Sequence, residues 1–410
     1  MSNVARVSRK TILLVNQHGD NRGDEAAMRG LIAAIRVRVP DSDIIVFHQF
    51  ASRDSEIDLH DVTYLPIRLP LGEALRMSIW AVFRALRLNL KFVLGGVGRA
   101  TVESYERADL VISAPGGPYF GDLYWKHEVV HWFYVWLGKT FDKPVSLYQT
   151  SAGPFRLGLL NLLRRRGYGW FSFLSVREKI SAENIYRLTG QQPYVGSDSA
   201  LHQSVGPADL TAWRGRLNLS GSRPIVTVAL RDPGSKYRAR HDAAAKALLE
   251  YLLISFDVVL LPQLHGDRHN DAPYLLSICG GLDHPEGVVV VAPTTLSSDD
   301  QRSLIAASRF VIAGRYHPLV FAASSGVPAI VIPYEHKAVG FAGDAGLTEF
   351  VVELSEISGE KLILTANELL GRLEEVEKRL GENLPALVAR AELVCDETIK
   401  LLIGSIGASR

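Results

Sequence analysis

Short, uninterrupted runs of apolar residues alternate with helix-like segments along the first half of the chain. The segments 23–39 and 181–189 repeat apolar residues at the spacing of a helix face. The apolar runs have the length of strands, and they cover residues 11–16, 43–47, 108–113, 145–149 and 173–176. Continuous apolar strands that alternate with helices are typical of a parallel sheet with helices on both faces. We therefore predict an α/β lobe with a Rossmann-like sheet in this half.

The same pattern restarts after a polar segment at residues 206–222. A helix is predicted over residues 241–255, and strands are predicted over residues 224–230, 257–261, 288–291, 310–312 and 329–332. The length of 410 residues also favours two lobes, because single cores rarely grow beyond roughly 250 to 300 residues. We expect an N-terminal lobe over residues 1–203, a C-terminal lobe over residues 204–360 and a helical tail over residues 361–410.

Composition and charge exclude several classes of protein. Lys and Arg total 45 against 44 Asp and Glu, so the formal net charge of +1 gives no field that attracts nucleic acid. The two cysteines, Cys279 and Cys395, are too few and too far apart for a disulfide framework or a thiolate zinc site. The start of the sequence lacks a signal-peptide pattern, and no run reaches the ~20 apolar residues of a membrane-spanning helix. We therefore expect a soluble, cytoplasmic protein.

Residues 77–97 come closest to a membrane segment. Arg84, Arg87 and Lys91 interrupt the apolar residues of this stretch, which we interpret as a basic amphipathic helix. Such a helix either packs on the core of its lobe or touches a membrane or a lipid-linked substrate. The second interpretation would place the protein at the inner face of the membrane.

Polar residues and glycines follow the predicted strands of the first lobe. In open parallel sheets, ligands bind outside the carboxyl ends of the strands. The loop after residues 11–16 contains Asn21, Asp24 and Glu25 and opens a helix, whose N-terminus can hold an anion or a sugar hydroxyl. For Asp24 we favour a substrate contact, whereas for Glu25 we favour helix capping, since carboxylates are common at helix starts. Candidate binding residues at the next strand ends are Gly116, Gly117, Gln149 and Ser151.

Cationic residues gather at three strand ends of the second lobe. Arg231 follows the strand 224–230, and Arg315 and His317 follow the strand 310–312. Lys337 comes shortly after the strand 329–332. Arginine offers a planar fork of donors that matches carboxylate and phosphate, and a helix that starts near His317 adds its dipole. This set suits a small, highly charged anion. The alternatives are a structural role for His317 and ion pairs of Arg231 and Arg315 with Asp or Glu between the lobes.

A metal site is not expected. The chain contains neither a cysteine cluster nor an HExxH pattern. His265 and His269, with Asp267 and Asp271, could be read as a metal patch, but they follow a predicted strand in a polar segment. We therefore favour a solvated or inter-lobe loop for them.

Several of these segments, taken in order along the chain, resemble motifs of the polysaccharide pyruvyl transferase family. They are Asn21-Arg22-Gly23-Asp24-Glu25-Ala26, Gly116-Gly117, Gln149-Thr150-Ser151-Ala152-Gly153-Pro154, Val176-Arg177-Glu178-Lys179-Ile180-Ser181, Arg315-Tyr316-His317 and Gly326-Val327-Pro328. The resemblance implies a GT-B-like α/β fold, with two Rossmann-like lobes that face each other across a cleft.

The resemblance also implies the reaction and its partners. The donor would be phosphoenolpyruvate, and the acceptor would be a sugar of a surface glycan or of its lipid-linked precursor. No redox cofactor is implied. By motif match, Arg231, Arg315 and His317 take the donor-binding positions in the C-terminal lobe, which leaves the N-terminal lobe to the acceptor.

Three departures from the family pattern bear on the acceptor more than on the donor. Pro118 stands where the family usually has a third glycine, and Ser199 follows Asp198 in place of proline. His18 and Asp20 precede the Asn21 motif.

In the reaction that the resemblance implies, His317 is our candidate acid and Asp24 our candidate for orienting or deprotonating the acceptor. An imidazole titrates near neutral pH, which suits proton transfer. Two other functions stay open. One is a GT-B glycosyltransferase that uses a nucleotide sugar, and the other is a non-catalytic module that binds a sugar or an anion.

Overall fold

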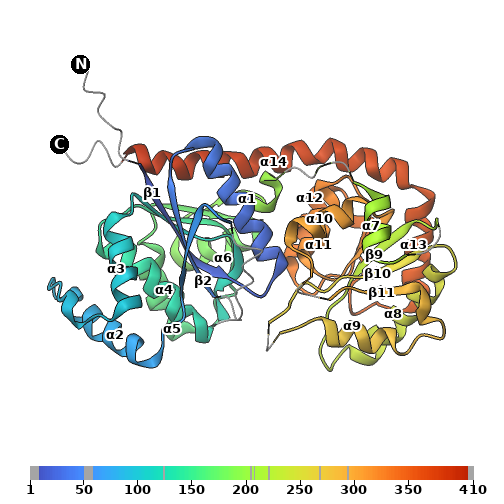
Figure 1. The fold of residues 1–410 in the computed structure, drawn as a ribbon, viewed down its shortest axis with the longest axis horizontal. Helices are drawn as coiled ribbons and strands as arrows, with labels where there is room; N and C mark the ends of the chain where they lie inside the picture. The colour runs from blue at the N-terminus through green and yellow to red at the C-terminus, as the bar shows by residue number, and fades with distance from the viewer. Residues whose placement is uncertain are drawn as a thin grey trace, which may run out of the picture. The chain divides into compact units, whose positions relative to one another are not determined.

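The computed structural model describes residues 9–49, 59–122, 125–203, 206, 208–219, 222–266, 269–292 and 295–404. They form two compact units (Figure 1). Unit 1 comprises the residues up to Gly19, then Met28–Ser199, and the residues from Ala391 onward. Unit 2 comprises Asp20–Ala27 and Ala200–Arg390.

The segment Asp20–Ala27 belongs to unit 2, although the sequence assigns it to the first lobe. The backbone amide of Arg22 donates to the carbonyl of Gln263 at 3.1 Å, and Asn21 pairs with Leu264 in an isolated antiparallel bridge. Ala26 lies in the hydrophobic core of unit 2. The first turns of helix α1 (Arg22–Arg38) are thus part of unit 2, while its later turns lie in unit 1.

Unit 1 contains one parallel sheet of eight strands. Its order is β3-β2-β1-β4-β6-β7-β8, and β5 pairs with β6. The strands are β1 (Thr11–His18), β2 (Asp43–Gln49), β3 (Val62–Pro66), β4 (Leu110–Ser113), β5 (Gly116–Phe120), β6 (Val145–Ala152), β7 (Phe173–Val176) and β8 (Tyr194–Val195). Their fully buried apolar side chains explain why the central strands read as continuous apolar runs.

Helices cover both faces of this sheet. One face carries α2 (Leu71–Ala85), α3 (Gly96–Arg107), α4 (Trp125–Thr140), α5 (Gly158–Tyr168) and α6 (Lys179–Thr189), which share a core with β1, β4 and β6. The other face carries α1 and the last turns of α14 (Leu373–Gly404), through Val394, Cys395 and Leu402. The long helix α14, red in Figure 1, therefore supplies part of the core of unit 1.

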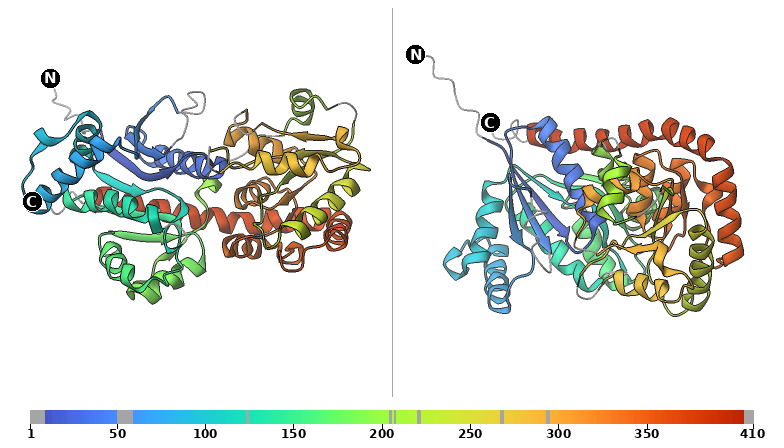
Figure 2. Two further views of the ribbon diagram at one scale, coloured as in Figure 1. Left: turned by 90° about the horizontal axis from the view of Figure 1, so that it is seen from below. Right: turned by 45° about the vertical axis from the view of Figure 1, so that its right-hand side comes forward.

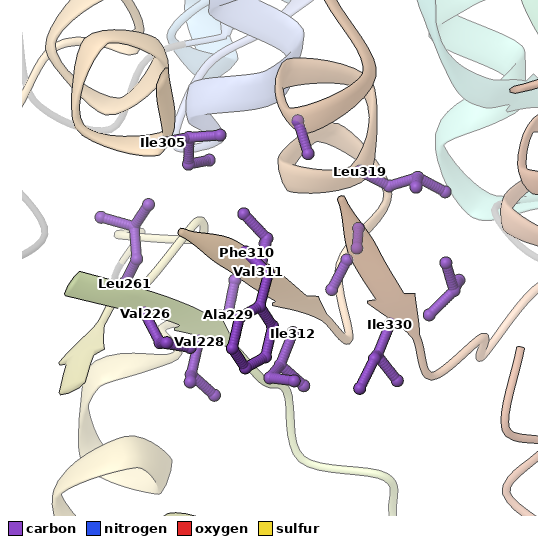
Figure 3. Close-up of a cluster of buried hydrophobic side chains, with 14 of the residues drawn as sticks. Val226, Val228, Ala229, Leu261, Ile305, Phe310, Val311, Ile312, Leu319 and Ile330 are labelled. Carbon is purple, nitrogen blue, oxygen red and sulfur yellow. The ribbon is translucent and has the colours of Figure 1, made fainter. Parts of the chain in front are cut away.

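Unit 2 contains a parallel sheet of five strands in the order β11-β10-β9-β12-β13. The strands are β9 (Ile225–Ala229), β10 (Asp257–Leu260), β11 (Val288–Val290), β12 (Phe310–Ala313) and β13 (Ala329–Val331). Val226, Val228, Phe310, Ile312 and Ile330 of three adjacent strands pack together in its core (Figure 3).

The remaining helices belong mainly to unit 2 and surround this sheet (Figure 2). The α-helices are α7 (Leu210–Arg216), α8 (Arg238–Leu253), α9 (Ala272–Cys279), α10 (Ser298–Ala306), α11 (Tyr316–Ser324), α12 (His336–Ala345) and α13 (Gly359–Gly371). Short 3₁₀ helices cover Lys91–Val93, Ser199–His202, Pro285–Gly287 and Thr348–Phe350.

All ten predicted strands are confirmed, and the predicted α/β class with parallel sheets is confirmed with them. The single helix predicted over residues 77–97 is wrong. Helix α2 ends at Ala85, Arg87 has a left-handed φ of 66°, and α3 begins at Gly96. Among the helices that the structure describes, none combines the length and apolar content that crossing a bilayer requires.

Both sheets reverse their strand order at one place. In unit 1 the order turns between β1 and β4, and in unit 2 it turns between β9 and β12. Loops at such a switch point diverge to opposite faces of the sheet, which leaves a crevice at the carboxyl ends of the strands where ligands bind. We therefore expect a ligand site at the loops after β9 and β12 or at the loops after β1 and β4.

Candidate functional site

The switch point of unit 2 carries a cluster of cations around one aromatic ring. Arg231 follows β9, Arg315 follows β12, and Tyr334 and Lys337 follow β13. The guanidinium carbons of Arg231 and Arg315 lie 4.1 and 5.7 Å from the centroid of the Tyr334 ring. The Lys337 ammonium lies 5.6 Å from the same centroid. The structure thus brings together three residues that the sequence predicts for the donor.

Arg315 is held in place by a buried carboxylate. Its Nε and Nη2 atoms donate to Asp271, whose carboxylate also accepts the backbone amides of Gln263 and Leu264. Burial disfavours the guanidinium charge, but Asp271 and Tyr334 outweigh burial and raise the pKa of Arg315. Because Asp271 occupies one edge of the guanidinium, the other edge is oriented for a ligand. The sequence left open an ion pair of Arg315 between the lobes, whereas the partner found, Asp271, lies in the same unit as Arg315.

Lys337 has a carboxylate close to its charged group, whereas Arg231 does not. The ammonium of Lys337 is buried and lies 2.9 Å from the Glu335 carboxylate. Arg231 donates from Nε to the carbonyl of Asp232 and forms no ion pair with any residue that the structure describes. Arg231 is therefore the cation of this cluster whose charge is least compensated.

The imidazole of His317 packs directly against Gly23. His317 lies in the first turn of α11 and is buried. A Cβ atom placed on Gly23 would lie only 1.8 Å from Nδ1 of His317, so only glycine fits there. The motif around Asn21 and the motif around Arg315 are far apart in the sequence, and this contact joins them within unit 2.

The neighbours of Gly23 fix the loop and the start of α1. The side-chain oxygen of Asn21 accepts the amide of Gly23 at 2.9 Å, and its Nδ2 donates to Asp24 at 3.1 Å. The buried Glu25 carboxylate accepts from Arg22 at 2.8 Å, and from the amide and hydroxyl of Ser298 at 3.2 and 2.8 Å. Glu25 thus binds the first turn of α10, whereas helix capping was expected at its own helix. Asp24 lies beside Gly23 in the same unit as the cations.

Gly116 and Gly117 form the start of a strand, where the sequence predicts a loop. They begin β5, with φ angles of 123° and 91° that favour glycine. A Cβ on Gly117 would lie 2.5 Å from the backbone nitrogen of Tyr119. The carbonyl of Gly116 accepts from the Thr150 hydroxyl of β6 at 2.9 Å.

Gln149 and Ser151 point into the interior of unit 1. Gln149 is fully buried and donates to the Ala391 carbonyl of α14 at 3.0 Å. The Ser151 hydroxyl accepts from Arg177 at 2.9 Å and donates to Glu178 at 3.2 Å. Arg177 also donates to Asp198 at 3.1 Å, and all these side chains are buried. The contacts found for Gln149 and Ser151 are structural, and a substrate contact for either remains a prediction.

A histidine pair at the carboxyl end of β1 was not selected from the sequence. His18 and His131 approach within 3.2 Å through their Nε2 atoms, and His18 stacks on Tyr119 at 4.6 Å. His131 Nδ1 lies 3.0 Å from the Tyr119 carbonyl, which can only accept, so this nitrogen is the donor. Burial is the main cause that lowers the pKa of His18 well below its usual range and that of His131 to about 4. Lone histidines far apart in sequence gave no signal of this contact.

Two of the four residues that could be read as a metal patch have other partners, and Asp267 lies outside the described residues. Asp271 binds Arg315, and His265 pairs with Asn270 in an isolated bridge. Within the described part of the chain, no group of three or more His, Cys, Asp or Glu side chains could hold a metal ion.

Comparison with solved structures identifies the fold. A UDP-GlcNAc 2-epimerase from Neisseria meningitidis, solved with UDP-GlcNAc, aligns over 95% of this chain and 99% of its own, with a TM-score of 0.58 and 13% identity. HepE from Anabaena, solved with UDP-glucose, aligns over 96% and 99%, with a TM-score of 0.60 and 15% identity. The fold of this chain is therefore GT-B-like, with two Rossmann-like units.

Sequence comparison identifies the family. The amylovoran biosynthesis protein AmsJ of Erwinia amylovora is 25% identical over 398 residues, which cover 90% of this chain and 94% of AmsJ. The family described as polysaccharide pyruvyl transferase matches residues 21–336, from the Asn21 loop to His336, one residue before Lys337. The chain therefore belongs to the polysaccharide pyruvyl transferase family, and it is a transferase.

Proposed function

We propose that this transferase moves a pyruvyl group from phosphoenolpyruvate to two hydroxyls of a sugar and so forms a pyruvate ketal. The acceptor would be an exopolysaccharide or its lipid-linked precursor. The observation that carries this proposal is the cluster of Arg231, Arg315 and Lys337 around Tyr334, at the switch point of unit 2. Phosphoenolpyruvate is a compact anion with a carboxylate and a phosphate, and both groups match such a cluster.

The donor would be held by the cations that keep free donor capacity. Arg231 can offer a bidentate contact, since no carboxylate of the described residues pairs with it. Arg315 offers the edge that Asp271 leaves open, and Lys337 adds a charge near the same ring. Fixed cations at this place would also stabilise the charge that develops on the departing phosphate.

Proton transfer would begin at His317. Protonation of the methylene carbon of phosphoenolpyruvate makes an oxocarbenium-like centre, which one sugar hydroxyl attacks. The bond between that carbon and the phosphate oxygen breaks, and the second hydroxyl closes the ketal. Two hydroxyl protons are released. One returns to the acid that protonated the methylene carbon, and the other leaves with phosphate. We assign the proton donation to His317 and the orientation or deprotonation of the acceptor to Asp24.

We further propose that the enzyme works in the cytoplasm, at the inner face of the membrane. Helix α2 supports this, because its buried face holds Met77 and Trp80 while Leu71, Leu75 and Val82 are exposed. The sequence between Glu73 and Glu103 holds five basic residues and no acidic one. An exposed apolar face with basic residues around it is typical of a helix that lies on a membrane.

The test is a direct assay of transfer. The purified protein is incubated with phosphoenolpyruvate and a panel of oligosaccharide acceptors, and products are analysed by mass spectrometry together with released phosphate. The expected result is a pyruvyl mass increment matched by an equal amount of phosphate, which Arg231→Gln strongly reduces. Transfer of a hexose from a UDP-sugar, with no reaction of phosphoenolpyruvate, would contradict the proposal and favour a glycosyltransferase.

A further inference from the structure

A cationic pocket lies in unit 1, between α5, α6 and the loop after β6. Its volume is about 370 Å³, which is in the range of ligand pockets. Three of its lining residues are arginines and two are asparagines: Arg156, Arg165, Arg187, Asn161 and Asn184. The family motifs and the cluster around Tyr334 include none of these five residues.

The pocket keeps an excess of positive charge. None of the described residues that line the pocket is acidic. Among the described residues, the Arg156 guanidinium has no hydrogen-bond or ion-pair partner. Within the described part of the chain, the Arg165 side chain donates only from Nε, to the Leu188 carbonyl at 2.9 Å. Arg187 pairs with Glu183 at 3.2 Å, but both side chains are largely exposed. Arginine forks with this much unused donor capacity suit a phosphate group.

Helix α5, which lines the pocket, exposes a row of leucines beside it. Leu159 is 84% exposed, and Leu162 and Leu163 are each 65% exposed. Arg166 lies on the same outward face, whereas Arg164, Gly167 and Tyr168 form the buried face. Large leucines exposed at helical spacing, with arginines next to them, are typical of a surface that enters the headgroup region of a bilayer.

We propose that the pocket between α5 and α6 binds the phosphate of a lipid headgroup while Leu159, Leu162 and Leu163 enter the membrane. The inference rests on the membrane contact proposed above and adds a specific binding site to it. Helices α2 and α5 both lie along the lower border of unit 1 in Figure 1. A basic residue near an anionic bilayer strengthens binding by roughly fivefold, and apolar insertion adds to this.

The test is sedimentation of the full-length protein with vesicles of phosphatidylcholine alone or mixed with phosphatidylglycerol. We expect the mixed vesicles to bind the protein. The double variant Arg156→Gln/Arg165→Gln should weaken that binding roughly tenfold or more. The double variant Leu159→Ser/Leu163→Ser should also weaken it, although it keeps every charge.

A matched control is Lys378→Gln, because Lys378 is as exposed as Arg187 and also pairs with a glutamate on its own helix. It should bind vesicles like the unchanged protein. Equal binding by the arginine variant, with an unchanged melting temperature, would overturn the site while leaving the membrane contact of α2 intact. If inorganic diphosphate displaces the protein from vesicles and the leucine variant binds normally, the pocket takes a soluble anion and the proposal is also wrong. Failure of the unchanged protein to bind either vesicle would remove both membrane proposals, but would not touch the transfer reaction.

Discussion

Gly23 and His317 show how a single contact can link two motifs. The motif around Asn21 supplies a residue without a side chain, and the imidazole of the second motif takes the space where a Cβ would be. Their spacing in the sequence gives no hint of this, because the contact depends on the segment Asp20–Ala27 packing into unit 2. The glycine is therefore best explained by the position of the imidazole.

We predict that Gly23→Ala will inactivate the enzyme without unfolding it. The new methyl group would overlap His317 Nδ1, so the imidazole must move. Loss of a positioned acid–base group typically costs about 10²- to 10⁴-fold, and we expect a fall of at least about 10² in kcat. Steady-state kinetics and circular dichroism would measure this. Gly340→Ala is the matched control, since Gly340 lies in a helix of unit 2 and its Cβ would meet nothing within 4 Å. Normal turnover by Gly23→Ala would remove His317 from the mechanism.

Asp271 provides a second prediction at the scale of the residue. Asp271→Asn keeps the shape but removes the charge that orients Arg315. Breaking a buried ion pair costs about 3 kcal/mol or more, so the melting temperature should fall. The KM for phosphoenolpyruvate should rise as well, because the guanidinium is no longer fixed. Glu368→Gln, in an exposed pair with Arg372, should change neither. A lower melting temperature with an unchanged KM would make Asp271 a purely structural residue.

At the scale of the element, the histidine pair joins the end of β1 to helix α4. Because Nδ1 of neutral His131 donates to Tyr119, its Nε2 must accept from His18. Protonation of His131 would place two donors face to face in a buried site. The hydrogen bond between the two rings therefore requires a neutral His131.

This predicts that stability falls in mild acid. The pKa of His131 is lowered by burial from 6.5 to about 4. The unfolded chain thus binds the proton first, and the stabilising contribution is fully present above pH 6.5 and is lost as the pH falls toward 4. Each such group changes the free energy of unfolding by up to about 1.4 kcal/mol per pH unit. Melting temperatures at several pH values should drop more steeply for the unchanged protein than for His131→Asn.

His241 limits the size of that difference. Its pKa is also lowered to about 4, again mainly by burial, so the His131 variant should keep part of the acid sensitivity. His60→Gln, at an exposed position, should leave the whole profile unchanged. Identical profiles for the unchanged protein and His131→Asn would show that His131 does not titrate as a buried neutral group.

The sequence predicts elements well where burial is continuous and poorly where it is not. The ten strands it predicts are apolar runs, most of them fully buried. It misses β3, which is half-buried at the sheet edge, and β8, which has two residues. It also misses β5, because Gly116, Gly117 and Pro118 at its start are residues typical of a turn. The residues at the strand ends of unit 2 follow from topology alone, whereas Asp271 and His131 depend on contacts between distant segments.

At the scale of the whole molecule, ligand binding should distinguish the two enzyme classes. A ligand that binds only the folded protein stabilises it by about 2.7 kcal/mol at a hundredfold excess over Kd. For a chain of this length, the shift in melting temperature should be a few degrees at most. Phosphoenolpyruvate should give that shift and UDP should not. Arg315→Ala should abolish it. A shift with UDP alone would instead support a nucleotide-sugar enzyme.

The path of the chain has a consequence for how such enzymes can diversify. The chain enters unit 2 for Asp20–Ala27, returns to unit 1 at Met28, and leaves it again at Ala200. It comes back to unit 1 a last time with the final turns of α14. A cut near residue 203 would leave unit 2 without Gly23 and unit 1 without Val394 and Cys395. Gene recombination at that point would therefore produce two defective halves. New acceptor specificity would have to arise by substitution within an intact gene, or by exchange of three segments at once.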